Sequence, residues 1–153
     1  MIFVYDCKSV IMTDRVPGGT TVTATYYCQF LQKLRRNMHA NRPDLLEKGV
    51  FILNDNARPH IGKVVRELLD RYSREVLPHP PYSPDISPPN FDLFPKLKIN
   101  MRGVRFSTLD DLSASVTRRV RQLNCSTNLT GIMDLPECSD AVIPQKGDYT
   151  ERL

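Results

Sequence analysis

Asp55 is the residue of this sequence whose surroundings first suggest chemistry. It follows a short apolar run and precedes a helical pattern within LNDNARPHIGKVV, residues 53–65. Two-metal phosphoryl transfer uses several carboxylates around ions about 3.5–4 Å apart, and Mg²⁺ prefers hard oxygen ligands. A single aspartate does not make such a site. The simpler interpretation is that Asp55 caps the following helix, although Asn56 could cap it equally well and leave Asp55 for another role.

Short strands are predicted before and after Asp55. Residues 1–5 and 9–16 read as two strands joined by a turn at Asp6–Lys8. The wholly apolar run 50–53 is typical of a strand buried on both faces, and residues 75–77 suit another short strand. Asp55 is therefore expected just beyond the end of a buried strand.

Helices are predicted between these strands. Apolar residues recur with helical spacing over 22–38 and over 61–72. The proline-rich segment 78–89 cannot be regular, because proline lacks an amide proton and restricts the residue before it. Helical character resumes near Asn90, and a last helix begins at Ser107 or Thr108. This order predicts an α/β fold with a mixed sheet, whose ligand sites lie beyond the carboxyl ends of the strands.

Composition is that of an ordinary soluble globular protein. With 153 residues, 41 % apolar and 25 % charged, the chain is expected to form one domain with a moderate core. No apolar stretch approaches the roughly twenty residues of a membrane span. The four cysteines are spread singly, so free thiols are favoured over structural zinc or disulfides. The net charge of +4 is a mild signal for a polyanionic partner, although most such surpluses are only solvated surface.

Three stretches of the chain resemble a known family. NDNARPH at 54–60, EVLPHPPYSPDISPPNFDLFPKLK at 75–98 and GVRF at 103–106 are similar to the catalytic domain of mariner-type transposases, in order and in spacing. Weaker similarity extends over residues 4–45 and 131–151. The resemblance implies a ribonuclease-H-like α/β fold, a mixed sheet flanked by helices, in which three aspartates hold two Mg²⁺ or Mn²⁺ ions. It also implies a nuclear protein of DNA transposition, whose intact relatives cleave DNA strands and transfer them.

The resemblance assigns catalytic positions residue by residue. The family's second aspartate falls on Asp55, as a metal ligand, and the third falls on Asn90, after thirty-four intervening residues. Asn90 can offer a cation a neutral carbonyl oxygen but supplies no charge. Asp85 belongs to the Tyr-Ser-Pro-Asp motif. Asp92 lies two residues beyond Asn90, about 200° around a helix, and would point elsewhere.

The family's first aspartate has no match in this sequence. It lies in a segment resembling Gly-Asp-Glu-Lys-Trp, and the chain begins after that segment, whereas Asp6 matches a turn residue of the hairpin. We therefore expect a ribonuclease-H-like sheet that lacks its first central strand, with exposed strand edges and poor stability. Loss of two negative charges from a site built for two dications should leave weak metal binding or none.

Basic residues suggest two regions that could contact DNA. Arg58 and His60 follow Asp55 at a helix start, where backbone amides favour anions, although packing and capping would also explain them. A second set could contact phosphates in a sequence-independent, salt-sensitive way, with a solvated face as the alternative. This second set comprises Lys96, Lys98, Arg102 and Arg105, with Arg118, Arg119 and Arg121 on the last helix.

The sequence thus predicts a remnant of a mariner-type transposase catalytic domain. Residues 1–124 would form the partial ribonuclease-H-like domain, and residues 125–153 its loop-rich C-terminal tail. Such a chain would be catalytically inactive, with residual DNA binding. A domesticated, non-catalytic DNA-binding or protein-interaction module is the alternative, and an active nuclease would have to recruit Asp6 or Asp92. The expected partners are DNA and either a second copy or a full-length transposase, without a membrane.

Overall fold

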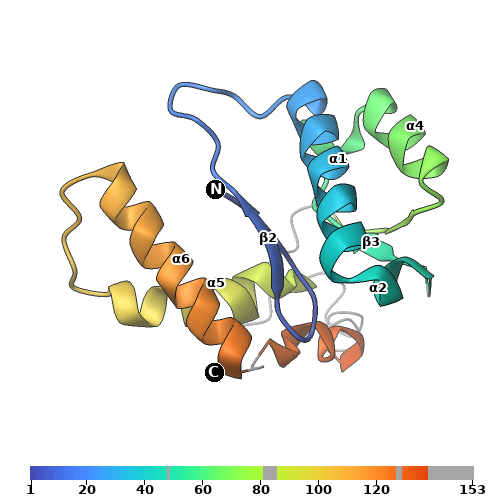
Figure 1. Ribbon diagram of the computed structural model, residues 1–153. Helices are drawn as coiled ribbons and strands as arrows, with labels where there is room; N and C mark the ends of the chain where they lie inside the picture. The colour runs from blue at the N-terminus through green and yellow to red at the C-terminus, as the bar shows by residue number, and fades with distance from the viewer. Residues whose placement is uncertain (48, 81–85, 127–128, 138–153) are drawn as a thin grey trace. The chain divides into compact units, whose positions relative to one another are not determined.

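The chain divides into two compact units. The computed structural model describes residues 1–47, 49–80, 86–126 and 129–137 (Figure 1). Unit 1 comprises residues 1–2 and 12–82, and unit 2 comprises residues 3–11 and 83–153. The two ligand positions that the sequence suggests are divided between them, with Asp55 in unit 1 and Asn90 in unit 2.

Two paired strands open the chain, β1 (Ile2–Tyr5) and β2 (Val10–Asp14). Asp6 organises the turn between them, because its Oδ1 accepts the backbone N–H groups of Lys8 at 2.8 Å and Ser9 at 2.7 Å. Aspartate favours such turns, since its short side chain reaches the backbone a few residues on. The predicted strands and the turn role of Asp6 are confirmed.

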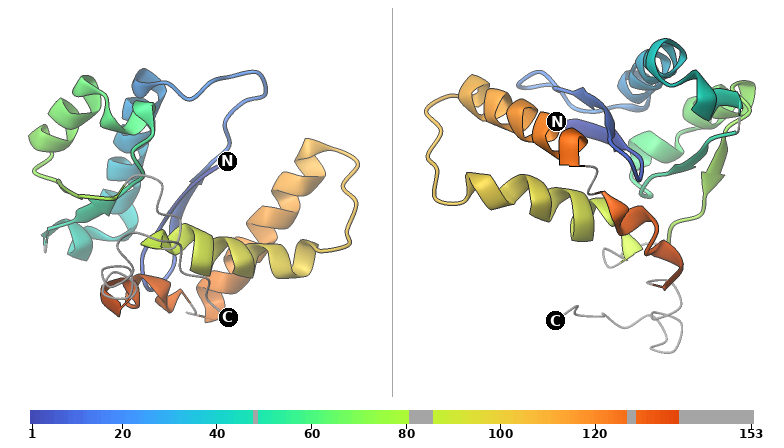
Figure 2. Two further views of the ribbon diagram at one scale, coloured as in Figure 1. Left: turned by 180° about the vertical axis from the view of Figure 1, so that it is seen from behind. Right: turned by 60° about the horizontal axis from the view of Figure 1, so that its bottom comes forward.

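Unit 1 is built on two helices that lie side by side in Figures 1 and 2, α1 (Ala24–Asn41) and α4 (Lys63–Arg71). Thr23 caps α1, and its Oγ1 accepts the Tyr26 backbone N–H at 3.2 Å. One apolar stripe on each helix is buried, as the periodicity predicts, although Ile61 and Val64 of the second pattern are exposed. These stripes contain Tyr27, Phe30, Leu31, Leu34, Met38, Val65, Leu68 and Leu69.

The helix predicted over 61–72 is interrupted near its start. A four-residue helix, α3 (Arg58–Ile61), precedes α4, and Gly62 between them has an extended backbone with ψ 144°. A Cβ at Gly62 would lie 3.0 Å from the Ala24 Cβ. Glycine therefore allows this break to lie close to α1. Another short helix, α2 (Pro43–Glu47), follows α1.

A second pair of strands, β3 (Phe51–Leu53) and β4 (Glu75–Leu77), runs parallel, with Ile52 opposite Val76. Both strands are confirmed, but the predicted burial of the first on both faces is wrong. Phe51 is 63 % exposed, and Val76 and Leu77 of β4 are also exposed. Within the described residues this sheet has only two strands. Parallel strands are usually covered on both faces, whereas these strands expose Phe51, Val76 and Leu77.

Unit 2 contains one long helix and several short ones. In chain order they are the π-helix η2 (Pro89–Leu93), α5 (Phe94–Lys98), the 3₁₀ turn η3 (Ile99–Met101), α6 (Leu109–Ser126) and the 3₁₀ turn η4 (Thr130–Ile132). α5 and α6 lie beside each other in both figures. Helical structure at Asn90 is confirmed, whereas residues 81–85 of the proline-rich segment, Asp85 among them, lie outside the described residues.

A reciprocal cap fixes the start of α6. Thr108 Oγ1 accepts the Asp111 backbone N–H at 3.0 Å, and Asp111 Oδ2 accepts the Thr108 backbone N–H at 3.1 Å. This pair satisfies two backbone donors at the helix start, and it confirms the predicted start. The helix continues to Ser126, two residues beyond the predicted division at 124/125, which stays a prediction.

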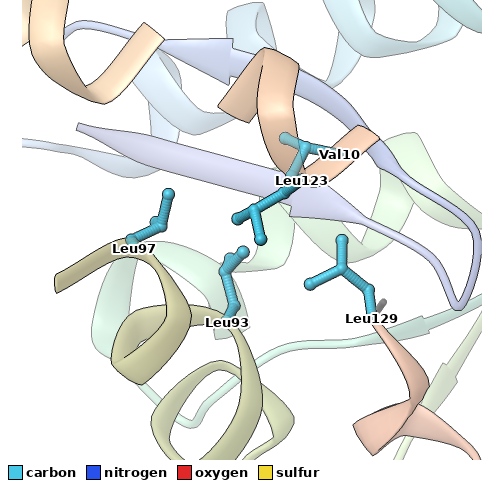
Figure 3. Packing of buried hydrophobic residues seen from close by; sticks show 5 residues of the cluster. All are labelled: Val10, Leu93, Leu97, Leu123 and Leu129. Atoms are coloured by element: carbon cyan, nitrogen blue, oxygen red, sulfur yellow. The ribbon is translucent and has the colours of Figure 1, made fainter. Parts of the chain in front are cut away.

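The core of unit 2 joins helices to the N-terminal strands. Figure 3 shows its buried members, Val10, Leu93, Leu97, Leu123 and Leu129. Asn124 of α6 adds a polar link to β2, because its Oδ1 accepts the Val10 backbone N–H at 2.8 Å and its Nδ2 donates to the Val10 carbonyl at 3.1 Å. The strand edge that Val10 would otherwise leave open is thus satisfied by a side chain.

Two predictions from composition can be compared with the structure. Cys7, Cys28 and Cys125 are free thiols, as expected, while Cys138 lies outside the described residues. In the part of the chain that the structure describes, no helix combines the length and the apolar character needed to cross a membrane.

Candidate functional site

Asp55 lies two residues beyond the end of β3, with its side chain 64 % exposed. Its Oδ1 accepts the Ala57 backbone N–H at 3.1 Å and lies 2.5 Å from Nδ1 of His60. Both contacts use the same oxygen. In the described part of the chain no hydrogen bond to Oδ2 is present, so this oxygen can accept a cation or a donor from outside.

Neither predicted cap of the following helix is present. Ala57 is the N-cap residue of α3, and no side chain caps it. Asp55 bonds instead to Ala57 itself, which precedes the helix, and Asn56 Nδ2 donates to the His79 carbonyl at 2.6 Å. The capping interpretation is wrong because the helix begins two residues later than it requires. The side chain of Asp55 instead contacts the backbone of its own loop and the ring of His60.

Tyr27 of α1 supports this loop from within unit 1. Its ring centroid lies 4.3 Å from that of His60, and its hydroxyl is hydrogen-bonded to the side chain of Asn54. Burial raises the pKa of Tyr27, the Asn54 hydrogen bond lowers it, and the Asp55 charge raises it. Sequence reasoning missed Tyr27, because periodicity places it only in the buried stripe of α1 and does not reveal its contacts with Asn54 and His60.

A cavity of about 710 Å³ lies next to Asp55 within unit 1. The loop after β3, the helix α4 and the strand β4 supply its walls, which carry carboxylate, imidazole and guanidinium groups. Its lining includes Asp55, His60, Arg66, Arg74, Leu77 and His79. Apart from Asp55 and His60, these residues were not among the predicted site residues, since they come together only when β4 pairs with β3.

Asn90 and Asp92 face different environments in unit 2. Asn90 is exposed in η2, while Asp92 is 5 % exposed, as the helical offset predicts. Asp92 Oδ2 accepts the Gly131 backbone N–H at 3.1 Å, and Oδ1 forms an ion pair with Lys96 Nζ. Within the described residues no three His, Cys, Asp or Glu side chains are grouped closely enough to hold a metal ion.

Tyr5 of β1 adds a second buried polar group to unit 2. In the described part of the chain its hydroxyl has no hydrogen-bond partner. Burial raises the pKa of Tyr5, and the negative charge of Asp92 raises it further. The phenol therefore stays protonated at neutral pH.

The predicted DNA-contacting residues fall into two groups by accessibility. Lys96 is paired with Asp92, and His60 with Asp55. Arg119 of α6 donates from Nε to the Lys96 carbonyl at 3.1 Å and from Nη1 to Gln122 Oε1 at 3.1 Å. The exposed members are Arg58 in unit 1 and Lys98, Arg102, Arg105, Arg118 and Arg121 in unit 2. Contact with DNA stays a prediction for the whole set.

Known proteins with a similar sequence are transposases or contain a related segment. The family described as Transposase (partial DDE domain) matches residues 1–48. The chain is 32 % identical to human histone-lysine N-methyltransferase SETMAR over 86 % of its length, and 30 % identical to the Mariner Mos1 transposase of Drosophila mauritiana over 96 %. It spans only 19 % of the first relative and 43 % of the second.

Solved structures of Mos1 share the fold. The Mos1 catalytic domain with raltegravir and Mg matches with a TM-score of 0.89 and 30 % identity, over 97 % of this chain and 75 % of that one. A Mos1 paired-end complex with the left transposon end matches with a TM-score of 0.88 and 30 % identity, over 97 % and 44 %. The predicted ribonuclease-H-like α/β fold is confirmed. This chain belongs to the catalytic-domain family of the mariner-type transposases.

Proposed function

We propose that this chain is a catalytically inactive mariner-type transposase domain that retains sequence-independent DNA binding. Asn90 carries the proposal: the resemblance matches it to the third metal-binding aspartate, and its exposed amide supplies no charge. The nearby carboxylate of Asp92 is buried and paired with Lys96. The two matched ligand positions within this chain therefore offer one negative charge in place of two.

Asp55 suits a single divalent ion better than a pair. Its carboxylate is 64 % exposed, and both of its described contacts use Oδ1. Mg²⁺ or Mn²⁺ bound there would polarise a phosphate oxygen as a Lewis acid. Asp55 alone would hold such an ion weakly, because Mg²⁺ keeps several of its waters when few carboxylates replace them. The magnesium in the related Mos1 catalytic domain supports this choice of ion.

Exposed cations support DNA as the partner. Arg58, Lys98, Arg102 and Arg105 lie at the surface, where they can contact phosphates without reading bases. The transposon end in the Mos1 paired-end complex points to the same partner. We extend the proposal to a nuclear location and to association with a second copy of the chain or with a full-length transposase.

A nicking assay tests the catalytic half of the proposal. The chain is incubated with supercoiled DNA and Mg²⁺ or Mn²⁺, with Asp55→Ala as the matched control. Both proteins should give the same background. Nicking by the original chain that Asp55→Ala abolishes would refute inactivity and would favour an active nuclease that recruits Asp6 or Asp92.

Gel shifts across a salt series test the DNA-binding half. Affinity should be independent of sequence and should fall steeply as salt rises, because bound counterions are released from the phosphates. Changing Lys98, Arg102 and Arg105 together to Gln should weaken binding to every DNA alike. Binding that is absent at low salt would contradict this part.

Exposed apolar residues favour one alternative, a domesticated protein-interaction module. Phe51, Val76 and Leu77 are exposed on the two strands of the β3–β4 sheet. Apolar surface next to an open strand edge is typical of protein contacts. Absence of DNA binding, combined with self-association that Phe51→Ser abolishes, would favour this alternative.

A further inference from the structure

We infer that His60 is a positioning residue that holds the carboxylate of Asp55 in one orientation, and that Tyr27 in turn holds His60. All three residues belong to unit 1. The consequence for metal binding rests on the proposed function of Asp55. The orientation itself rests only on the contacts of these side chains.

The orientation is set at one oxygen of Asp55. Oδ1 lies 2.5 Å from His60 Nδ1 and also accepts the Ala57 backbone N–H at 3.1 Å. An aspartate side chain that is 64 % exposed would otherwise populate several rotamers. Ala57 is only two residues away and belongs to the same loop, so His60 is the partner that links the carboxylate to the packed part of unit 1.

His60 is itself fixed against a buried helix. Its side chain is 21 % exposed, and its ring lies 4.3 Å from that of Tyr27 with a tilt of 42°. Tyr27 is 6 % exposed and cannot move without disturbing the packing of α1. The Tyr27 hydroxyl also bonds to the side chain of Asn54, which directly precedes Asp55. Tyr27 therefore supports the loop on both sides of the carboxylate.

This arrangement prepares Asp55 for a cation. Because both contacts occupy Oδ1, Oδ2 remains for an incoming ion. A ligand already held in place loses less conformational freedom when the ion binds. Partners that orient metal ligands typically change metal affinity by about 10- to 100-fold. His60 would thus act on the ion through Asp55, without touching it.

Three variants of the full chain test the orientation without any metal. His60→Ala removes the contact with Asp55. His60→Asn keeps a nitrogen donor close to the place of Nδ1, whereas His60→Gln, of similar polarity, moves the donor further out. His39→Ala changes an exposed histidine of α1 as a control. Three-bond NMR couplings report how many rotamers Asp55 populates, and the amide spectrum checks that each variant is folded.

The couplings should show one dominant Asp55 rotamer in the original chain, in His60→Asn and in His39→Ala. They should show averaging in His60→Gln and His60→Ala. An averaged side chain in the original protein, or a single rotamer in both His60→Ala and His60→Gln, would overturn the inference. Because this measurement needs no ion, it decides the positioning role even if the proposed metal function fails.

Mn²⁺ binding, followed by the electron spin resonance of the free ion, tests the consequence. His60→Ala should weaken binding by about 10-fold, and His60→Asn should recover most of it. Asp55→Asn should remove binding. If the original chain binds no Mn²⁺, or if Asp55→Asn binds it equally, the proposed metal role is wrong. If Asp55 binds Mn²⁺ but His60→Ala changes nothing, the positioning consequence is wrong.

Discussion

Asp55 in unit 1 and Asp92 in unit 2 both lie in stretches shared with mariner-type transposases, yet their surroundings differ sharply. Asp55 is 64 % exposed and keeps one carboxylate oxygen without a partner in the described part of the chain. Asp92 is 5 % exposed, and both of its oxygens have partners, Lys96 and the Gly131 backbone N–H. The first is available to a ligand, whereas the second is used within the fold.

The difference shows why Asp92 does not replace Asn90 as a metal ligand merely by lying two residues away in the sequence. A buried carboxylate is stable only when cations and N–H donors compensate its charge. Those same donors then compete with any metal ion. Asp6 has a structural role of its own, because its Oδ1 accepts two backbone N–H groups and organises the hairpin turn. Asp92 therefore does not replace the charge that Asn90 lacks.

The largest expected effect follows from removing the buried carboxylate. Asp92→Ala should lower the free energy of unfolding by about 2–3 kcal/mol, since it deprives Lys96 and the Gly131 N–H of their Asp92 partner. Asp55→Ala should lower it by less than about 1 kcal/mol, because its side chain is solvated. Urea denaturation followed by circular dichroism measures both. Equal losses of unfolding free energy in the two variants would show that the buried and the exposed aspartate contribute alike to stability.

Gly131→Ala should lower the free energy of unfolding slightly less, by about 1–3 kcal/mol, because overpacking forces neighbouring atoms to shift. A Cβ at Gly131 would lie 2.7 Å from the Asp92 Cγ. The closest clash is with the Cβ of Asp92, which alanine would keep. The loss should therefore be smaller when Asp92 is replaced by glycine, which removes both the Cβ and the carboxylate. Gly18→Ala is the control, because a Cβ there meets nothing within 4 Å. Additive losses in a double-mutant cycle would show that the two residues are not coupled.

Tyr5 should make unit 2 sensitive to alkali. Burial raises the pKa of Tyr5 and the Asp92 charge raises it further, so the folded chain holds this proton more tightly than the unfolded chain does. The stabilisation is complete below the unfolded pKa of about 10. It is lost progressively as the pH rises from there towards the folded pKa. As the pH rises through this range, the urea midpoint of unfolding should fall less steeply for Tyr5→Phe than for the original chain. An equal pH dependence of the midpoint in the two proteins would show that Tyr5 is not the responsible group.

Much of the fold could be predicted because it depends on local pattern. Helical spacing placed α1 and α4, and the residue types Thr108 and Asp111 suit the cap that starts α6. Two details depended on distant residues and could not be predicted. The break at Gly62 lies close to Ala24, and the exposure of Phe51 depends on what packs over β3, which the apolar run 50–53 does not reveal.

The candidate site was only partly predictable for the same reason. A motif match selected Asp55 and Asn90, since residue type and spacing are local information. The contact between Tyr27 and His60 joins α1 to α3. The hydrogen bond between Gly131 and Asp92 joins residues that are 39 positions apart in the sequence. Neither contact has a signature within one segment. The sequence therefore indicated which residues could do chemistry. It did not indicate which of their side chains are already bonded to other groups within the protein.

The smallest expected effect is the coupling between Asp55 and His60. A double-mutant cycle with alanine should give at most about 1 kcal/mol, as exposed charged pairs do, whereas the same cycle for Asp92 and Lys96 should give more. A coupling as large at Asp55 as at Asp92 would remove the distinction between the two sites. A small value is compatible with the positioning role of His60, because about 1 kcal/mol already favours one rotamer roughly fivefold. The contact can orient a ligand while contributing little to the stability of the fold.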